Sequence, residues 1–165
     1  MNEALRQLRR AVAGAGFARV PMSAPREATV LAFDFGTRRV GVAIGNTIVR
    51  AARALTTIDA EASDARFAAI AALIAQWRPD ELVVGIPLHA DGTEHATTQR
   101  ARRFARQLAG RFQLPVAEVD ERYSTQEAQS LIDQSTKRGR ERRARRDAVA
   151  AQVILQAWLD EHDAQ

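Results

Sequence analysis

The feature that most constrains the fold is residues 30–45, in which two short apolar runs flank a polar turn. The first run is Val30-Leu31-Ala32-Phe33, and the second is Val40-Gly41-Val42-Ala43-Ile44. Runs this short, rich in β-branched and aromatic residues and broken by glycine, are typical of neighbouring strands in a sheet that is covered on both faces. Between them, Gly36 and the Thr37-Arg38-Arg39 step favour a hairpin-like connection. We therefore expect two adjacent strands that open the folded part of the chain.

Asp34 does not fit this setting, because it interrupts an otherwise apolar strand. A bare carboxylate in a buried strand costs on the order of several kcal/mol unless it is paired or binds a cation. Positions that break the local pattern in this way are often functional. Asp34 is therefore the first candidate site residue.

The composition indicates one compact domain. The chain has 165 residues, of which 46% are apolar and 27% charged, enough for one substantial core. It has no cysteine, which excludes disulfides and thiolate metal sites and is compatible with the cytoplasm. No apolar stretch is long enough to span a bilayer or to form a signal peptide, so we expect no membrane partner and a cytoplasmic location.

The excess of basic residues favours an anionic partner. The net charge is +4, and Lys137 is the only lysine among the 24 lysines and arginines. Arginine holds phosphate through two parallel hydrogen bonds, which makes nucleic acid a plausible partner. An arginine excess can equally reflect genomic base composition.

The order of the remaining elements predicts an α/β fold. We expect a flexible N-terminal extension over residues 1–28 and one folded domain over residues 29–162. The further strands are expected at Ala52–Ile58, Leu82–Ile86 and Pro115–Asp120. The helices are expected from Ser63 or Asp64 to Trp77, from a Thr93 cap to just before Gly110, from Ser124 to Ile132, and from Asp147 to Glu161. This order implies a five-stranded mixed sheet, an antiparallel three-strand meander plus two parallel strands, with helices on both faces.

A second acid follows the last expected strand, where Asp120 and Glu121 compete for the role. Side chains alternate along a strand, so Glu118 and Asp120 share one face and Glu121 lies on the other. Glu118 prefers solvent, which puts Glu121 on the packed side. We prefer Glu121.

Asp147 is the third acid, and it is in phase with the apolar stripe of the last expected helix. The residues three, four, seven and eleven positions later share its face of a helix; they are Ala150, Ala151, Ile154 and Trp158. Asp147 would then point toward the sheet. The alternative is a structural role as the N-cap of that helix.

Carboxylates that converge without histidine or cysteine are suited to a hard, oxygen-seeking cation such as Mg²⁺ or Mn²⁺. Magnesium binds through few carboxylates together with waters and substrate phosphate. Paired ions could activate an attacking water and neutralise the leaving oxygen of a phosphodiester.

Four ordered motifs together resemble the YqgF (RuvX) family. They are Asp34-Phe35-Gly36-Thr37-Arg38-Arg39-Val40-Gly41-Val42-Ala43, Val84-Gly85-Ile86-Pro87-Leu88 with Asp91-Gly92-Thr93-Glu94, Asp120-Glu121-Arg122-Tyr123-Ser124-Thr125, and Asp147-x-x-Ala150-Ala151-x-x-Ile154-Leu155. The resemblance covers residues 29–160 and leaves out the N-terminal extension.

The resemblance implies a ribonuclease H-like fold, a cytoplasmic location and a nuclease that matures the 5′ end of pre-16S rRNA; the family is also described as Holliday-junction-resolvase-like. By motif position it implies that Asp34, Glu121 and Asp147 form the catalytic, metal-binding centre. One departure stands out. Many ribonuclease H-like nucleases carry an acid at the end of the fourth strand, where this chain has Gly85-Ile86-Pro87-Leu88-His89, so Glu121 must serve instead.

The nucleic-acid-binding residues are expected near these motifs and in the basic segment at 137–146. They are Thr37, Arg38, Arg39, Arg122, Ser124, Thr125, Lys137, Arg138, Arg140, Arg142 and Arg143. The alternative for the basic segment is a solvated, mobile loop.

Other functions stay open from the sequence. The substrate is RNA or branched DNA, and the protein could instead be a ribosome assembly factor that binds RNA without cleaving it. Asp34-x-Gly36-Thr37 is also similar to the first phosphate loop of actin-like ATPases, but the chain is too short for the second domain that those enzymes need. The oligomeric state, monomer or homodimer, is not determined.

Overall fold

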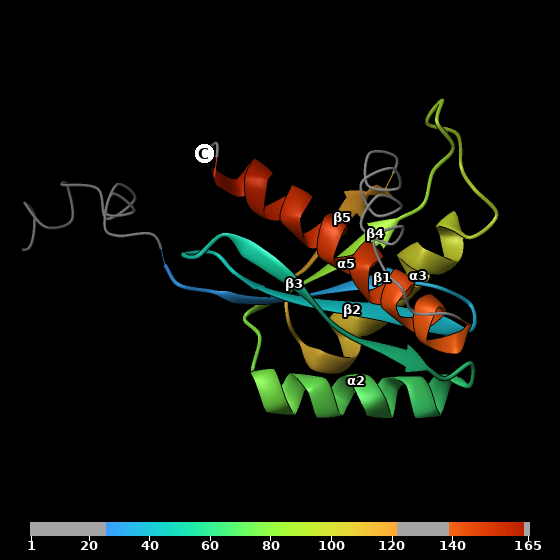
Figure 1. Cartoon of the computed structure of the whole chain (residues 1–165), viewed down its shortest axis with the longest axis horizontal. Helices are drawn as coiled ribbons and strands as arrows, with labels where there is room; N and C mark the ends of the chain where they lie inside the picture. Colours follow the sequence, from blue (N-terminus) through green and yellow to red (C-terminus); the bar gives the residue numbers. More distant parts are fainter. Residues whose placement is uncertain (1–25, 122–138, 164–165) are drawn as a thin grey trace, which may run out of the picture.

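The computed structural model describes residues 26–121 and 139–163 of the chain, and Figure 1 shows their arrangement. The strands are β1 (Thr29–Phe35), β2 (Arg39–Asn46), β3 (Ala51–Asp59), β4 (Glu81–Ile86) and β5 (Val116–Asp120). The helices are α2 (Ser63–Trp77), α3 (Thr98–Phe112) and α5 (Arg140–Asp163). No helix within these described residues is long and apolar enough to cross a membrane.

The strands form one mixed sheet in the order β3-β2-β1-β4-β5. β1 pairs antiparallel with β2, and β2 pairs antiparallel with β3. β4 runs parallel to both β1 and β5. The predicted combination of a three-strand meander with two parallel strands is confirmed, because helices α2 and α3 return the chain to the same end of the sheet before β4 and β5.

The two faces of the sheet carry separate cores. Leu31 and Phe33 of β1 point toward α2 and α3 and pack with Phe104 of α3. The alternate residues Val30 and Ala32 point toward α5 and pack against its apolar stripe. In Figure 1, α5 accordingly lies on one side of the sheet and α2 on the other. Asp34 continues the Val30–Ala32 set, so the alternation directs it to the α5 face.

The last helix is longer than the sequence predicted, because α5 begins at Arg140. Much of the basic segment at 137–146 is therefore helical instead of a loop, which is consistent with the high helix propensity of arginine. Asp147 lies two turns inside α5, so the alternative that it caps the N-terminus is wrong.

The start of α3 also differs from the expectation. This helix begins at Thr98, and Thr93 instead donates its hydroxyl to Asp91 in a local turn, at 2.6 Å. Gly110 lies inside the helix, which ends at Phe112. A short polar turn between Asp91 and Thr98 thus replaces the predicted cap.

Helix α2 follows Ala62, which has no side-chain capping hydrogen bond, so neither Ser63 nor Asp64 serves as its cap. The expected helix from Ser124 to Ile132 lies outside the described residues, as does nearly all of the predicted extension at 1–28.

Candidate acidic site at one end of the sheet

Two glycines flank Asp34 on the neighbouring strands. Asp34 is opposite Gly41 of β2 and opposite Gly85 of β4 in the strand register. Cross-strand partners project to the same face of a sheet, so the α5 face carries a carboxylate between two positions that have no side chain. The missing side chains leave room for other groups to approach Asp34.

The space above Gly85 is filled by Glu121. A Cβ atom placed on Gly85 would lie 2.3 Å from Glu121 Oε1 and 2.4 Å from Ile154 Cδ1. Glu121 follows β5 directly and folds its carboxyl back over Gly85 toward Asp34. Asp120 pairs with Ile86, which belongs to the core on the opposite face. The structure therefore brings Glu121, and not Asp120, over the end of β4 at Gly85.

The space above Gly41 is filled by the backbone of α5. A Cβ atom on Gly41 would lie 1.8 Å from the carbonyl oxygen of Asp147. The close approach of helix and strand brings the second turn of α5 alongside β1 and β2. Asp147 and Arg146 are thereby placed near Asp34, although more than 100 residues separate them in sequence.

The two nearest carboxyl groups share a proton. Burial is the main reason that the pKa of Asp34 is raised to about 6. A hydrogen bond from Glu121 and attraction to Arg146 lower this pKa, whereas repulsion from Asp147 raises it. Burial also raises the pKa of Glu121 to about 10, with further contributions from Asp34 and from Asp120. At neutral pH, Glu121 is therefore protonated and donates to the Asp34 carboxylate, as expected for two acids held in contact.

Asp147 is held by a different partner. Arg39 Nε donates to Asp147 Oδ2 at 2.8 Å, and both side chains are half-buried. This contact raises the pKa of Arg39. Within the described ranges, no group of three or more acidic or histidine side chains is arranged to hold a metal ion. The structure thus places Asp34 in contact with Glu121, while Asp147 lies nearby and is paired with Arg39. Binding of one ion by all three acids stays a prediction.

This donor set fits a divalent cation of the magnesium type. Asp34 and Glu121 supply only oxygen, and the repulsion from Asp34 that adds to burial in raising the pKa of Glu121 is what a bound cation would relieve. Magnesium is commonly bound by one or two carboxylates with waters and substrate phosphates completing the shell. A two-carboxylate site is therefore sufficient, and Asp147 could join it if its ion pair with Arg39 opened.

The predicted nucleic-acid contacts divide into two groups. Thr37 and Arg38 are exposed in the turn between β1 and β2, beside Arg39. Arg140, Arg142 and Arg143 are exposed at the start of α5, and Arg140 reaches Asp59 at 3.1 Å. The remaining expected contacts lie outside the described residues; they are Arg122, Ser124, Thr125, Lys137 and Arg138.

Two arginines near the site have roles that the sequence did not single out. Arg146, at the end of the predicted basic segment at 137–146, acts electrostatically on Asp34 from the exposed surface of α5. Arg66 is buried, and it donates to the backbone carbonyls of Ala60 and Thr37. Its contact fixes the turn between β1 and β2; no periodicity in the sequence indicated this role.

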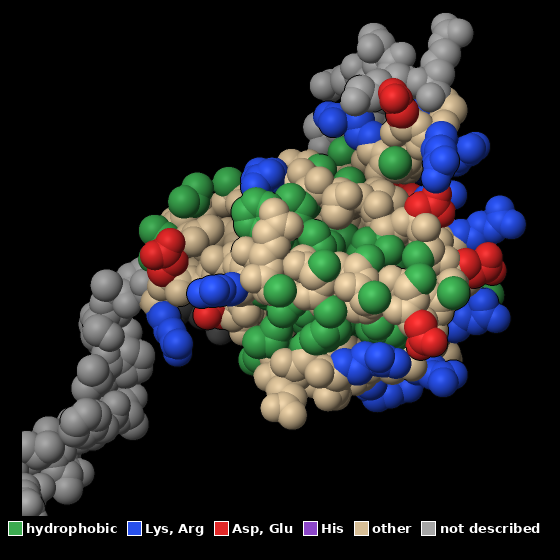
Figure 2. Space-filling view, turned by 90° about the horizontal axis from the view of Figure 1, so that it is seen from below, with side chains coloured by type: hydrophobic (Ala, Val, Ile, Leu, Met, Phe, Trp, Pro, Cys, Tyr) green, Lys and Arg blue, Asp and Glu red, His purple; other side chains and the backbone are tan. Residues whose placement is uncertain are grey.

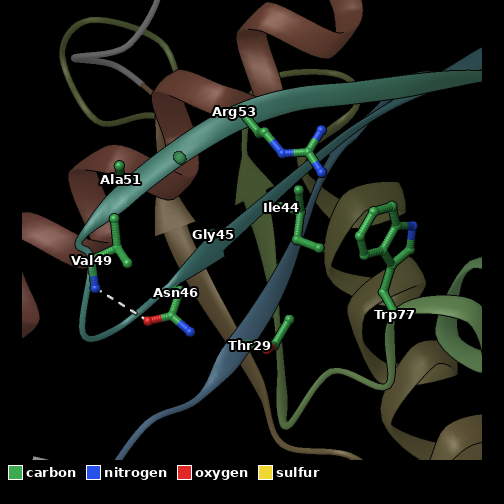
Figure 3. Close-up of a pocket in the computed structure, with 9 residues that line it drawn as sticks. Thr29, Ile44, Gly45, Asn46, Val49, Ala51, Arg53 and Trp77 are labelled. Carbon is green, nitrogen blue, oxygen red and sulfur yellow. Dashed lines mark hydrogen bonds between the residues drawn. The ribbon is translucent and has the colours of Figure 1, made fainter.

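A surface pocket of about 420 Å³ lies at the other end of the sheet. Figure 3 shows Ile44 and Trp77 on its walls, with Arg53 over the Trp77 ring at 5.3 Å from its centroid. Thr29, at the start of β1, also lines it and is five residues from Asp34. At about 3.3 Å per residue this is roughly 17 Å along the strand. The pocket is therefore separate from the acidic site.

Comparisons with known proteins agree with the motifs. A family model described as "RuvX: Holliday junction resolvase" matches residues 28–161. A protein of Burkholderia cenocepacia named "Putative pre-16S rRNA nuclease" is 55% identical over 136 residues, which cover 82% of this chain and 91% of that protein. A Burkholderia multivorans protein of the same name is also 55% identical, with the same coverage.

A solved structure shares the fold. The Thermus thermophilus RuvC in complex with a Holliday junction substrate superposes with a TM-score of 0.53, covering 84% of this chain and 97% of that one. The sequence identity is 16%, so this likeness concerns the fold alone. The predicted ribonuclease H-like architecture is confirmed by this match and by the strand order.

Proposed function

The chain belongs to the RuvX family, and from this premise we propose that it is a metal-dependent endonuclease that hydrolyses phosphodiester bonds of RNA. We propose that it acts in the cytoplasm on pre-16S rRNA, at the 5′ end of the mature sequence. The names of the Burkholderia relatives support this substrate. The structural observation that carries the proposal is the contact of Asp34 with Glu121 at the site that Gly85 leaves open.

In this proposal Asp34 and Glu121 hold the divalent ion, Mg²⁺ or Mn²⁺. When bound, such an ion activates water and neutralises the charge that develops on a phosphodiester. The residues of the chain build this site and hold the two acids in place. Gly85 leaves the space in which the Glu121 carboxyl reaches Asp34, and the core on the α5 face fixes Asp34 by burying Val30 and Ala32 beside it. The acids are thus pre-organised before substrate arrives.

Arg39 gives the site a means of responding to substrate. Its guanidinium is a good phosphate ligand, yet in the described structure it is held by Asp147. If a phosphate of the substrate bound Arg39 in place of Asp147, the Asp147 carboxylate would become free to join Asp34 and Glu121 in holding the ion. We propose that binding of the nucleic acid and completion of the acidic centre are coupled through this exchange. In this proposal, Thr37, Arg38 and Arg146 hold the flanking backbone.

A cleavage assay tests the proposal. Purified protein is incubated with labelled precursor 16S rRNA and with a four-way DNA junction, each with and without Mg²⁺. We expect Mg²⁺-dependent cleavage of the RNA. Asp34→Asn and Glu121→Gln should lower the rate by roughly 100-fold or more, the scale expected when a pre-organised electrostatic group is removed. Asp64→Asn is the matched control, because Asp64 is an exposed acid on the opposite face.

The outcomes separate the alternatives. If Asp34→Asn and Asp147→Asn process the precursor at the parental rate, the nuclease proposal fails. Tight RNA binding with no cleavage under any condition would favour an assembly factor. Cleavage of the junction in preference to the RNA would favour a resolvase-like DNA nuclease, the second candidate, which the description of the matching family model supports.

A further inference from the structure

Helix α3 carries an unusual charge pattern. Its 15 residues include five arginines and no acid. The arginines are Arg100, Arg102, Arg103, Arg106 and Arg111. None of them belongs to the motifs that define the acidic site. The charge of this single helix therefore exceeds the +4 of the entire chain.

Arg103 and Arg106 lie opposite the buried stripe, whereas Arg111 packs over the ring of Phe67, with its Cζ 4.0 Å from the ring centroid. Phe104 and Leu108 face the sheet and are almost fully buried. With 3.6 residues per turn, Arg103 and Arg106 project to the opposite side, together with Gly110, and all three are exposed. Both aromatic rings of the helix belong to the core or pack against it. The outer face of α3 is thus basic, acid-free and without exposed aromatic groups.

Arginine-rich composition does not account for this pattern, because the neighbouring helix on the same face lacks it. α2 has one arginine, Arg66, and it is buried. The exposed positions of α2 are mainly alanines, among them Ala68, Ala71 and Ala75. Figure 2 shows this side of the molecule, with hydrophobic side chains in the middle and Lys and Arg mainly around the edge. On this side of the sheet, basic charge therefore belongs to α3 and not to α2, while five further exposed arginines lie at the start of α5 on the other face.

The basic face begins at the end of the sheet that holds the acidic site. Thr98, the first residue of α3, donates its hydroxyl to the carbonyl of Pro87, and Pro87 is two residues beyond Gly85. Thr98 also accepts a hydrogen bond from the His95 backbone at 2.7 Å. Because Thr98 is fully buried, these bonds fix the start of the helix firmly against the strand end. From there α3 leads away from the acids.

We propose that the outer face of α3 binds the phosphate backbone of the RNA strand whose scissile bond lies at Asp34 and Glu121. Arg103 and Arg106 make the central contacts, and Arg100 extends them toward the site. Arg102 forms an ion pair with Glu94 at 2.6 Å, which ties the turn before α3 to the helix. With no exposed aromatic side chain to stack on bases, the face recognises backbone charge and not sequence. This inference rests on the proposed function, because it assigns the second contact region of the same substrate.

The test is the salt dependence of binding, which does not require cleavage. Fluorescence anisotropy gives the affinity for a labelled precursor rRNA fragment in chelator at several KCl concentrations. Each phosphate contact contributes about 0.7 to 0.9 to the slope of log K against log salt. Arg103→Gln/Arg106→Gln should therefore reduce the slope by roughly 1.4 to 1.8. Arg53→Gln/Arg78→Gln removes the same charge from exposed positions at the other end of the sheet and should leave the slope unchanged.

A second measurement separates this interface from the catalytic proposal. With Mg²⁺, the α3 double variant should lower kcat/KM for long RNA but not for a substrate of two or three nucleotides. Melting temperatures should match the parent, because the substituted side chains are exposed. A normal slope in the α3 double variant, or an equal loss of slope in the control variant, overturns the inference. Loss of slope with no cleavage by any variant supports the interface and refutes the nuclease.

Discussion

Replacing Gly85 with alanine is the sharpest test of how the acidic site is built. The added Cβ would lie 2.3 Å from Glu121 Oε1, 2.4 Å from Ile154 Cδ1 and 2.9 Å from Glu121 Cγ, whereas ordinary contact begins near 3.4 Å. Both neighbours must therefore move by about 1 Å. Adding a methylene to a packed site costs about 1–3 kcal/mol. We expect Gly85→Ala to lower the free energy of unfolding by that amount and to push the Glu121 carboxyl off Asp34.

The assay is urea unfolding of cation-free protein, combined with calorimetric Mn²⁺ titration. In a Glu121→Ala background the two closest Glu121 contacts are gone and only Ile154 must shift, so Gly85→Ala should cost less there. Neighbouring residues of this kind typically couple by about 0.5–3 kcal/mol. The Mn²⁺ affinity should fall in Gly85→Ala, because one of its two proposed carboxylate ligands is displaced.

Gly110→Ala is the control, because a Cβ at Gly110 meets nothing within 4 Å. Inside a helix, glycine is less stable than alanine by about 0.5–1 kcal/mol, so this variant should be stabilised. The reasoning is refuted if Gly85→Ala also stabilises the protein, or if its cost is the same with and without the Glu121 side chain.

Three further expectations concern the surroundings of the site. Arg39→Gln should raise the Mn²⁺ affinity several-fold by releasing Asp147 and should weaken RNA binding; unchanged values of both would argue against the exchange proposed above. Since burial raises the pKa of Asp34 from about 4 to about 6, the folded protein binds more protons than the unfolded chain in this window, so the stability of the cation-free protein should fall as pH rises through it. Urea midpoints measured from pH 4 to 7 check this, and Asp34→Asn should reduce the dependence to the part that Glu121 contributes, since burial raises the pKa of Glu121 as well. Thr98→Val should cost about 1–3 kcal/mol in urea unfolding by leaving the Pro87 carbonyl without its donor; a loss below 0.5 kcal/mol would contradict this role.

The sequence alone was sufficient for the fold. Short runs such as Val30–Phe33 and Leu82–Ile86, and the apolar spacing of α2 and α3, predict strands and helices because burial requires those periods. The predicted helices before β4 and before β5 also indicate that these strands run parallel, since parallel strands need crossover connections. Boundaries were less accurate: α5 begins at Arg140, and its first turns contact β3, where Arg140 pairs with Asp59 and the Thr57 hydroxyl donates to the carbonyl of Ala144.

The sequence predicted only part of the site. Asp34 stood out because a carboxylate interrupts an apolar strand, and strand alternation favoured Glu121 over Asp120. The sequence did not predict that Glu121 contacts and hydrogen-bonds Asp34, or that Asp147 forms an ion pair with Arg39. These depend on distances between segments up to 108 residues apart. Such distances are fixed by which strands lie side by side and where a side chain is missing, and only the tertiary structure decides both.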